Sequence, residues 1–366
     1  VYAPVLLPSY PVFETAVVDL VGENAEAGAT VRLFSSGASI ELSQAVADAE
    51  GGFTFSSVVL PLGANLLVAE ATDGNLNVSR RSAEILLVRN ERPAEPSGFS
   101  AVANGDVAEL SWDASAEGDL SGYLVRRDAE ILNARGPVLG GVTAAASKNP
   151  GAARNVIDGL STYWNIGSQE EQWIELRLAT PRHVEEIRLV WAAQFAASDY
   201  DLLIEIEGRL APVARVRGNT QFSTSIHGLP IPVRTPRVRL QIYSGVHSFG
   251  VLLQEFQLFG ILPGTGTAFT DEPSQPGFYD YAVSALDVLG GRSDDAGPVR
   301  LAVGDVTPPD PPVSLVATAN GIDVFLEWSA PSAQDVERYR VFRDGVLIGE
   351  SLSASFADRS LRNGSY

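Results

Sequence analysis

Two segments of the chain repeat one pattern of strands and turns, and this repeat constrains the fold more than any other feature. The first reads "VAELSWDASAEGDLSGYLVRRDAEILN" from Val107, and the second reads "DVFLEWSAPSAQDVERYRVFRDGVLIG" from Asp323. Such self-similarity predicts two copies of one structural unit. The aligned pairs that keep their residue type are Trp112 with Trp328, Tyr123 with Tyr339, and Arg127-Asp128 with Arg343-Asp344.

The two copies continue differently. In the second copy the chain runs on at once through "ESLSASFADRSLRNGSY" and stops at Tyr366, so we expect this copy to be incomplete. In the first copy the equivalent continuation, "GTGTAFTDEPSQPGFYDYAVSALD", begins only at Gly264. A block of about 130 residues is therefore inserted at the hairpin after Asn133, a position where exposed turns tolerate insertion.

Short strand signals dominate the rest of the sequence. Runs such as "ATVRLF", "GFTFSSVVL" and "WIELRL" alternate with turns rich in Gly, Pro, Asn and Asp, and no helical stripe of three turns occurs. Regularly spaced short strands predict an all-β chain of sandwiches or barrels. The 366 residues are enough for several separate cores.

Composition excludes several classes of function. The chain has no cysteine, which removes disulfides, thiol nucleophiles and thiolate metal sites. Its net charge of −19 disfavours nucleic acid and anionic lipid surfaces as partners. No apolar run approaches membrane-spanning length, so we expect no membrane insertion.

The repeated segments resemble fibronectin type III domains of secreted bacterial proteins, with Trp112 and Trp328 as their core tryptophans. The block before them, with turns "DAEGG" and "TDGN", resembles bacterial immunoglobulin-like domains. The predicted domains are a linker or domain end at 1–10, an immunoglobulin-like domain at 11–91, a split fibronectin type III domain at 95–134 and 263–304, an inserted domain at 135–262, a Pro-rich linker at 305–312, and an incomplete second fibronectin type III domain at 313–366.

The inserted block contains "DGLSTYW" from Asp158, then "QWIELRL" from Gln172, and closes with the pattern E-x-x-x-F-G from Glu255 to Gly260. These motifs, in this order, resemble the discoidin or coagulation factor type C family, which includes many galactose-type carbohydrate-binding modules. The resemblance implies an eight-stranded jelly roll whose termini lie side by side. We expect Tyr163 and Trp164 to pack at the base of this sandwich.

The same motifs suggest a cation. Asp158 and Thr162, with carbonyl oxygens of their loop, can surround a hard ion, and Glu255 from the last strand can close the cage, because calcium takes six to eight oxygen ligands. The resemblance implies a structural Ca²⁺ in many family members. The alternative is that Asp158 caps the turn and Glu255 pairs with an arginine.

Glycan sites in such modules lie on loops at one end of the sandwich, where an aromatic side chain stacks on the sugar and polar groups orient its hydroxyls. The candidate residues are Gln194, Phe195, Arg217, Asn219, His247 and Phe249. Two departures from the family make a galactose-type specificity doubtful. The loop after Trp191 reads "AAQFAAS" without a histidine, and the hairpin "EIEGRLAPV" lacks a tryptophan.

No catalytic motif is present: the three histidines have no paired spacing, and no nucleophile elbow or phosphate loop occurs. The sequence therefore predicts a non-enzymatic part of a secreted or surface-displayed bacterial protein. In this interpretation the inserted domain binds extracellular carbohydrate in an adhesive role, and the flanking sandwiches serve as spacers or a stalk. The alternatives are a structural protein that contacts neighbouring copies in a stalk, filament, sheath or surface layer, and an accessory region of a large secreted glycoside hydrolase.

Overall fold

The computed structural model describes residues 1–8, 10–38, 40–133, 135–138, 140–166, 171–192, 194–333 and 336–359. Its regular structure is almost entirely β-strand, which confirms the predicted all-β fold. The described residues form two compact units, the first made of 1–272 and 279–301 and the second of 273–278 and 302–366. Ala134, at a predicted domain border, and residues 360–366, at the predicted end of the last domain, lie outside the described residues.

The N-terminal part of the first unit is a sandwich of two sheets with orders β1-β3-β6 and β2-β8-β7-β4-β5. Buried and exposed residues alternate along β3, as they do in a strand with one face on a core. The strands are β1 (Val5–Leu6), β2 (Val12–Phe13), β3 (Val17–Glu23), β4 (Thr30–Ser35), β5 (Glu41–Val46), β6 (Phe53–Val59), β7 (Gly63–Thr72) and β8 (Ile85–Arg89). Residues 1–10, which the sequence predicts to be a linker or the end of a preceding domain, include β1, and β1 pairs with β3 and adds a strand to this sandwich.

A second sandwich has the sheet orders β21-β10-β9 and β12-β11-β22-β23. Its strands are β9 (Ser100–Asn104), β10 (Val107–Ser111), β11 (Leu120–Arg127), β12 (Glu130–Ile131), β21 (Ala268–Asp271), β22 (Gly277–Asp287) and β23 (Ala296–Val303). We call it the middle sandwich. Since β10 pairs with β21 and β11 with β22, chain segments from both sides of residues 135–262 share each sheet. The assignments to the immunoglobulin-like and fibronectin type III families stay predictions.

Residues 135–262, which we call the inserted domain, form one curled sheet with the order β13-β20-β16-β19-β17-β18; β14 pairs with β16 and β15 with β20. A short 3-10 helix, η1 (Pro150–Ile157), precedes β15. The strands are β13 (Arg135–Pro137), β14 (Val142–Ala146), β15 (Trp164–Ile166), β16 (Gln172–Trp191), β17 (Ala197–Ile206), β18 (Arg209–Val216), β19 (Thr224–Gly245) and β20 (Val251–Ile261).

The long strand β16 gives this sheet its curl. Its first part pairs with β14 and its second part with β20, while β19 pairs along both parts with a register shift between Arg177 and Arg182. Trp164 is fully buried in the resulting core, as predicted. The prediction for Tyr163 is wrong, because its side chain is 44% exposed. Only alternate residues of β15 point inward, and Trp164 and Ile166 take those positions.

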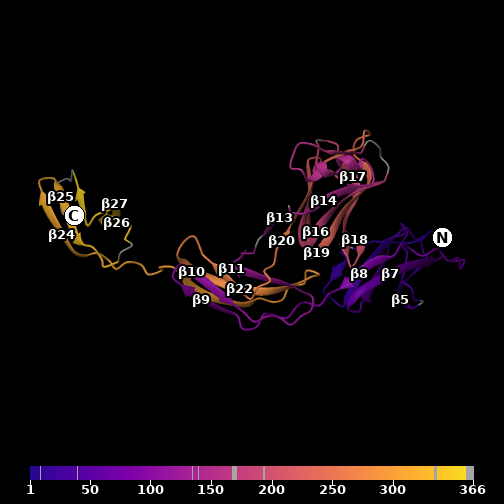
Figure 1. The fold of residues 1–366 in the computed structure, drawn as a ribbon, viewed down its shortest axis with the longest axis horizontal. Coiled ribbons are helices and arrows are strands. Elements are labelled where there is room, and N and C mark those ends of the chain that lie inside the picture. The colour runs from indigo at the N-terminus through magenta and orange to yellow at the C-terminus, as the bar shows by residue number, and fades with distance from the viewer. Residues whose placement is uncertain are drawn as a thin grey trace. The chain divides into compact units, whose positions relative to one another are not determined.

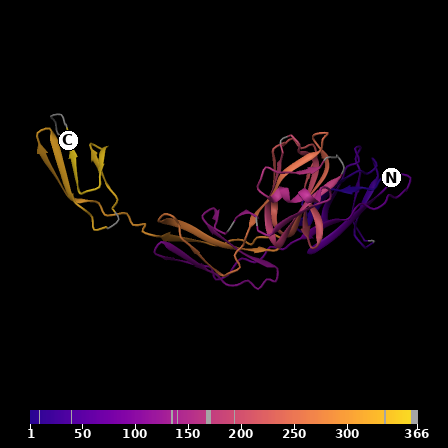
Figure 2. The ribbon, with the colours of Figure 1, turned by 45° about the horizontal axis from the view of Figure 1, so that its top comes forward.

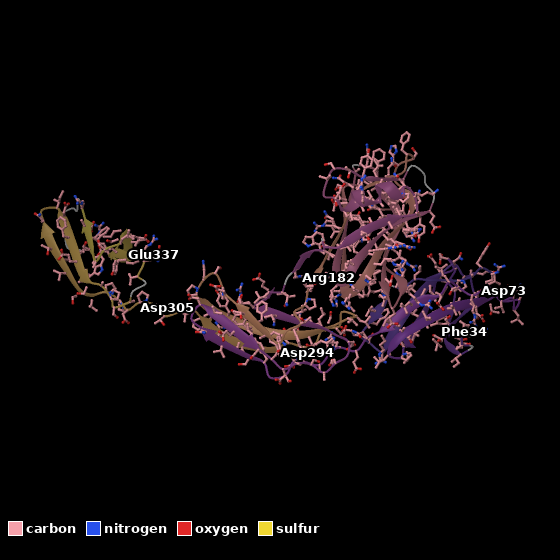
Figure 3. The ribbon with its side chains drawn as sticks, in the orientation of Figure 1. Phe34, Asp73, Arg182, Asp294, Asp305 and Glu337 are labelled. Atoms are coloured by element: carbon pink, nitrogen blue, oxygen red, sulfur yellow. The ribbon has the colours of Figure 1, made fainter. Side chains whose placement is uncertain are left out.

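Within the first unit, β8 and β18 lie side by side (Figures 1 and 2). The Arg209 guanidinium contacts the Glu84 carboxylate at 2.5 Å, and the Tyr10 hydroxyl donates to the Ile231 carbonyl at 2.6 Å. Arg182, labelled in Figure 3, lies on β16 at the end of the inserted domain nearest the middle sandwich. The loops that follow Trp191 lie at the opposite end of the domain.

The second unit contains the sheets β24-β25-β28 and β26-β27. Its strands are β24 (Val313–Asn320), β25 (Asp323–Ser329), β26 (Tyr339–Arg343), β27 (Val346–Ser351) and β28 (Ser355–Asp358). The two copies of the sequence repeat also pack their conserved tryptophan and tyrosine rings with nearly the same geometry. The rings of Trp328 and Tyr339 are 5.1 Å apart at 68°, and those of Trp112 and Tyr123 are 5.3 Å apart at 64°.

Candidate functional site

Three loops meet at one end of the inserted domain: residues 192 and 194–196 between β16 and β17, 217–223 between β18 and β19, and 246–250 between β19 and β20. Backbone hydrogen bonds join them. The Val246 N–H donates to the Ala196 carbonyl at 3.0 Å, and the Asn219 N–H donates to the Ser198 carbonyl at 2.8 Å. The sheet thus brings together side chains that are up to about 55 residues apart in the sequence.

The aromatic members of the predicted set form one group at this end. The His247 ring lies 5.0 Å from the ring of Phe195 and is stacked on that of Phe249 at 5.1 Å and 17°. The Phe249 N–H donates to His247 Nδ1 at 3.3 Å, which holds the imidazole in place. Phe249 is 74% exposed, so its ring is presented to solvent rather than packed in the core.

The polar members lie on the adjoining loops. Gln194 is exposed on the same loop as Phe195. The Arg217 guanidinium donates to Asp201 Oδ1 at 2.9 Å and lies 4.9 Å from the centre of the Tyr243 ring. Burial and the Asp201 charge raise the pKa of Tyr243 to about 12, so its hydroxyl stays protonated and donates to Asp201 at 2.9 Å.

The structure gives Asn219 a local role. Its side-chain amide donates to the carbonyls of Ala197 at 2.9 Å and Gln221 at 3.1 Å, and its carbonyl accepts from the Gln221 N–H at 2.9 Å. These bonds occupy both ends of the amide. Asn219 therefore shapes the loop that carries Arg217.

Asp199 is a residue that the sequence analysis missed. Its carboxylate accepts hydrogen bonds from the Ser244 hydroxyl, from the Ser198 hydroxyl at 2.7 Å and from the Gly218 N–H at 3.1 Å. The bond from Ser244 does most to lower the pKa of Asp199. The carboxylate ties the start of β17, the end of β19 and the loop after β18 together; a carboxylate at a strand start flanked by hydroxyl residues gives only a weak sequence signal of this role.

The predicted cation ligands lie at a second place, where the loop after η1 meets β20. The Asp158 carboxylate accepts hydrogen bonds from the Thr162 hydroxyl at 2.6 Å and the Leu160 N–H at 2.9 Å. The first of these bonds is the main reason why the pKa of Asp158 lies below its usual value. Asp158 thus stays ionised and also makes the turn contacts expected of a capping residue.

Glu255 faces this loop from β20. It is only 8% exposed, and its Oε1 atom has no hydrogen-bond partner among the described residues. Burial raises the pKa of Glu255, and the negative charge of Asp158 raises it further. No described arginine forms an ion pair with it in the structure, in contrast to the alternative weighed from the sequence. A buried carboxylate oxygen beside a second carboxylate is a poor arrangement for the protein alone and a suitable one for a cation.

The predicted cation ligands, Asp158, Thr162 and Glu255, include only two carboxylates. Among the described residues, no group of three or more His, Cys, Asp or Glu side chains is arranged to hold a metal ion. A calcium ion here would therefore use the two carboxylates with the Thr162 hydroxyl and backbone carbonyls, which are oxygen ligands that calcium accepts.

Comparison with known proteins identifies the class of the inserted domain. Residues 141–253 match the family model of the F5/8 type C domain, so the chain contains a discoidin-like domain of this kind. A comparison with curated proteins gives no match.

Several solved structures are similar to this part of the chain. Chitosan-binding module 1 of a chitosanase/glucanase from Paenibacillus sp. IK-5 is 22% identical over 34% of this chain and 99% of its own, with a TM-score of 0.31. CpGH89CBM32-5 from Clostridium perfringens, in complex with GalNAc-β-1,3-galactose, is 18% identical over 34% and 100%, with a TM-score of 0.31. The family 32 carbohydrate-binding module of C. perfringens NanJ, in complex with galactose, is 18% identical over 34% and 99%, with a TM-score of 0.31.

Proposed function

We propose that the inserted F5/8 type C domain binds carbohydrate at its loop end. The observation that carries this proposal is the ring of Phe249, exposed at the tip of a loop and backed by His247. The ring stacks on His247 and leaves most of its apolar surface exposed to solvent. It offers a face on which the C–H groups of a sugar ring can stack.

The neighbouring polar groups suit the hydroxyls of such a ligand. The Arg217 guanidinium keeps donors beyond those that bind Asp201, because its side chain remains about half exposed. Gln194 adds an amide with both donors and acceptors. A few polar groups beside an aromatic platform are typical of sites that orient a sugar.

The specificity is proposed to differ from that of galactose-type modules. His247 comes from the loop before β20, whereas the loop after Trp191 has no histidine. The imidazole and the exposed Phe249 ring therefore come from the loop before β20, Phe195 comes from the loop after β16, and the hairpin between β17 and β18 contributes no tryptophan.

Calcium is proposed as a structural ion held by Asp158, Thr162 and Glu255. Its charge would neutralise the two facing carboxylates and fasten the loop after η1 to β20. The role is structural because this cluster and the aromatic group lie on different loops.

The flanking sandwiches are proposed to present this domain as extracellular spacers, with immunoglobulin-like and fibronectin type III folds. In the described part of the chain, no helix is long and apolar enough to cross a membrane. The exposed position of Phe249 favours a ligand at the loop end over a purely structural role for the insertion.

A glycan-array screen of the full chain with calcium present tests the proposal. We expect reproducible binding of a set of related glycans, with at least a tenfold loss in Phe249→Ala and a smaller loss in Arg217→Ala, because losing about 1.4 kcal/mol of contact weakens binding tenfold. The matched control is Phe222→Ala, which removes another exposed ring from the adjoining loop. A blank array with folded protein, or equal binding by Phe249→Ala, would overturn the proposal.

A further inference from the structure

The charge of the chain is unevenly distributed. Residues 135–262 contain 12 Lys and Arg against 11 Asp and Glu, a net charge of +1, although the whole chain carries −19. The remainder therefore has 14 basic and 34 acidic residues, or −20. The inserted domain is therefore far less acidic than the rest of the chain, and a patch of arginine side chains on it can attract an anion.

Such a patch lies on the outer face of the sheet formed by β16, β19 and β17. We call it the arginine face, and it consists of Trp173, Glu175, Arg177, Glu205, Arg237 and Arg239. In the strand register Glu175 lies opposite Arg239, and Arg177 lies opposite Arg237. Like charges directly opposite each other on neighbouring strands destabilise a sheet unless an anion compensates them.

Glu175 supplies part of that compensation. Its side chain is 0% exposed although it lies on the outer face, because guanidinium groups cover it. Arg177 Nη2 lies 2.6 Å from Glu175 Oε1, and Arg239 Nη2 lies 2.6 Å from Glu175 Oε2. Burial raises the pKa of Glu175, but hydrogen bonds from Arg239 and Arg177, together with their charges, outweigh it and hold this pKa below its usual value.

The remaining contacts fix the other guanidinium groups. Arg237 Nη2 lies 2.7 Å from Glu205 Oε2, and the Arg239 guanidinium lies 4.3 Å from the centre of the Trp173 ring. Three guanidiniums thus share two carboxylates, which leaves one positive charge in excess. Arg177 is 59% exposed, and its Nε and Nη2 atoms both donate to Glu175 Oε1, so a buried carboxylate holds this guanidinium at the surface.

We infer that the arginine face binds an acidic polysaccharide, one that carries uronate or sulfate groups. Guanidinium groups held in place bind carboxylate and sulfate oxygens with little loss of side-chain entropy. A single polysaccharide chain is slender enough to follow one sheet face, whereas a wide polyanion such as duplex DNA would also meet the strongly acidic remainder of the chain. The inference concerns a surface separate from the loop end and does not rest on the proposed site there.

The test uses the full chain and immobilised polygalacturonate and dextran sulfate, with dextran as the neutral comparison. We expect binding to the two polyanions that weakens as NaCl rises, since salt screens exposed charges. Arg177→Gln should weaken it about two- to fivefold, the range for one exposed ion pair. The affinity of Arg177→Lys for the polyanions should lie between those of the original protein and Arg177→Gln. Lysine keeps the positive charge but lacks the forked pair of donors of the guanidinium group.

Two controls make the result specific. Arg135→Gln removes an arginine of similar exposure on β13 and should leave the affinity unchanged. Phe222→Ala, which removes an exposed ring at the loop end that is not part of the proposed sugar site, should also leave the affinity for polyanions unchanged. No binding at low salt, equal binding by Arg177→Gln, or equally tight binding of duplex DNA or polyglutamate would overturn the inference.

Discussion

At the scale of single residues, Asp158 and Glu255 show how two neighbouring carboxyl groups acquire opposite properties. Hydrogen bonds from Thr162 and Leu160 lower the pKa of Asp158, whereas burial and the Asp158 charge raise that of Glu255. Because the pKa of Glu255 is higher in the folded than in the unfolded state, the calcium-free protein should lose stability as pH rises above about 4.3, the unfolded value. Calcium should reverse this loss by favouring the ionised carboxylate.

Glu255→Gln tests this argument. It removes the charge that repels Asp158 and leaves an uncharged side chain of similar shape. We expect the calcium-free variant to be at least as stable as the original protein and to lose its calcium-dependent rise in melting temperature. A ligand at 100 times its Kd stabilises the folded state by about 2.7 kcal/mol, which differential scanning calorimetry detects easily. Asp106→Asn, in an exposed turn, should keep the full rise; an unchanged rise in Glu255→Gln would contradict the cation site.

At the scale of elements, the repeat in the sequence predicted matching strands, and the structure repeats even the contacts between them. Asp128 and Asp344 both adopt positive φ, 52° and 50°, at equivalent hairpins. The loop end was predictable only as a set of loops. Nothing in the sequence shows that the His247 ring contacts both Phe195 and Phe249. The strand register that brings these three residues together depends on the whole sheet.

The repeat keeps one ion pair, Arg127 with Asp271 in the first copy and Arg343 with Asp358 in the second, and this pair gives a prediction for the middle sandwich. Asp271 Oδ2 accepts from Arg127 Nη1 at 2.9 Å and from the Tyr281 hydroxyl at 2.7 Å, so it joins β21 to β11 and β22. Asp271→Asn should lower the free energy of unfolding by about 1–3 kcal/mol, the range for disrupting partly buried hydrogen bonds. Urea unfolding measures this, and Asp113→Asn, at an exposed position, should have little effect. Equal stability of the two variants would show that Asp271 does not join the strands energetically.

At the scale of the molecule, the first unit depends on contacts between its domains that involve buried titratable groups. Asn90 donates to the buried Asp287 carboxylate at 2.7 Å, which links the N-terminal and middle sandwiches. His183 of the inserted domain lies 2.8 Å from the Pro232 carbonyl through Nδ1 and 2.7 Å from the Ser121 hydroxyl of the middle sandwich through Nε2. A carbonyl only accepts, so Nδ1 carries the proton and the Ser121 hydroxyl donates to Nε2.

Burial and Arg234 lower the pKa of His183, and Arg182 lines the same cavity.

His183 should therefore weaken the attachment of the inserted domain in mild acid. Its folded pKa lies below the unfolded value of about 6.5, so the unfolded state takes up the proton first and stability falls as pH drops through 6.5. His183 alone should contribute a slope of at most about 1.4 kcal/mol per pH unit, measured by thermal unfolding between pH 7.5 and 5.5. The pKa of His227 is also lowered by burial, so His227 adds to the slope with the same sign. Asp287, whose pKa is raised by burial, acts in the opposite direction as pH falls, through the carboxyl range nearer pH 4. His183→Gln keeps a donor and an acceptor but cannot titrate, so it should reduce the slope and leave the part that belongs to His227. A slope that His183→Gln leaves unchanged would assign the pH dependence to other groups.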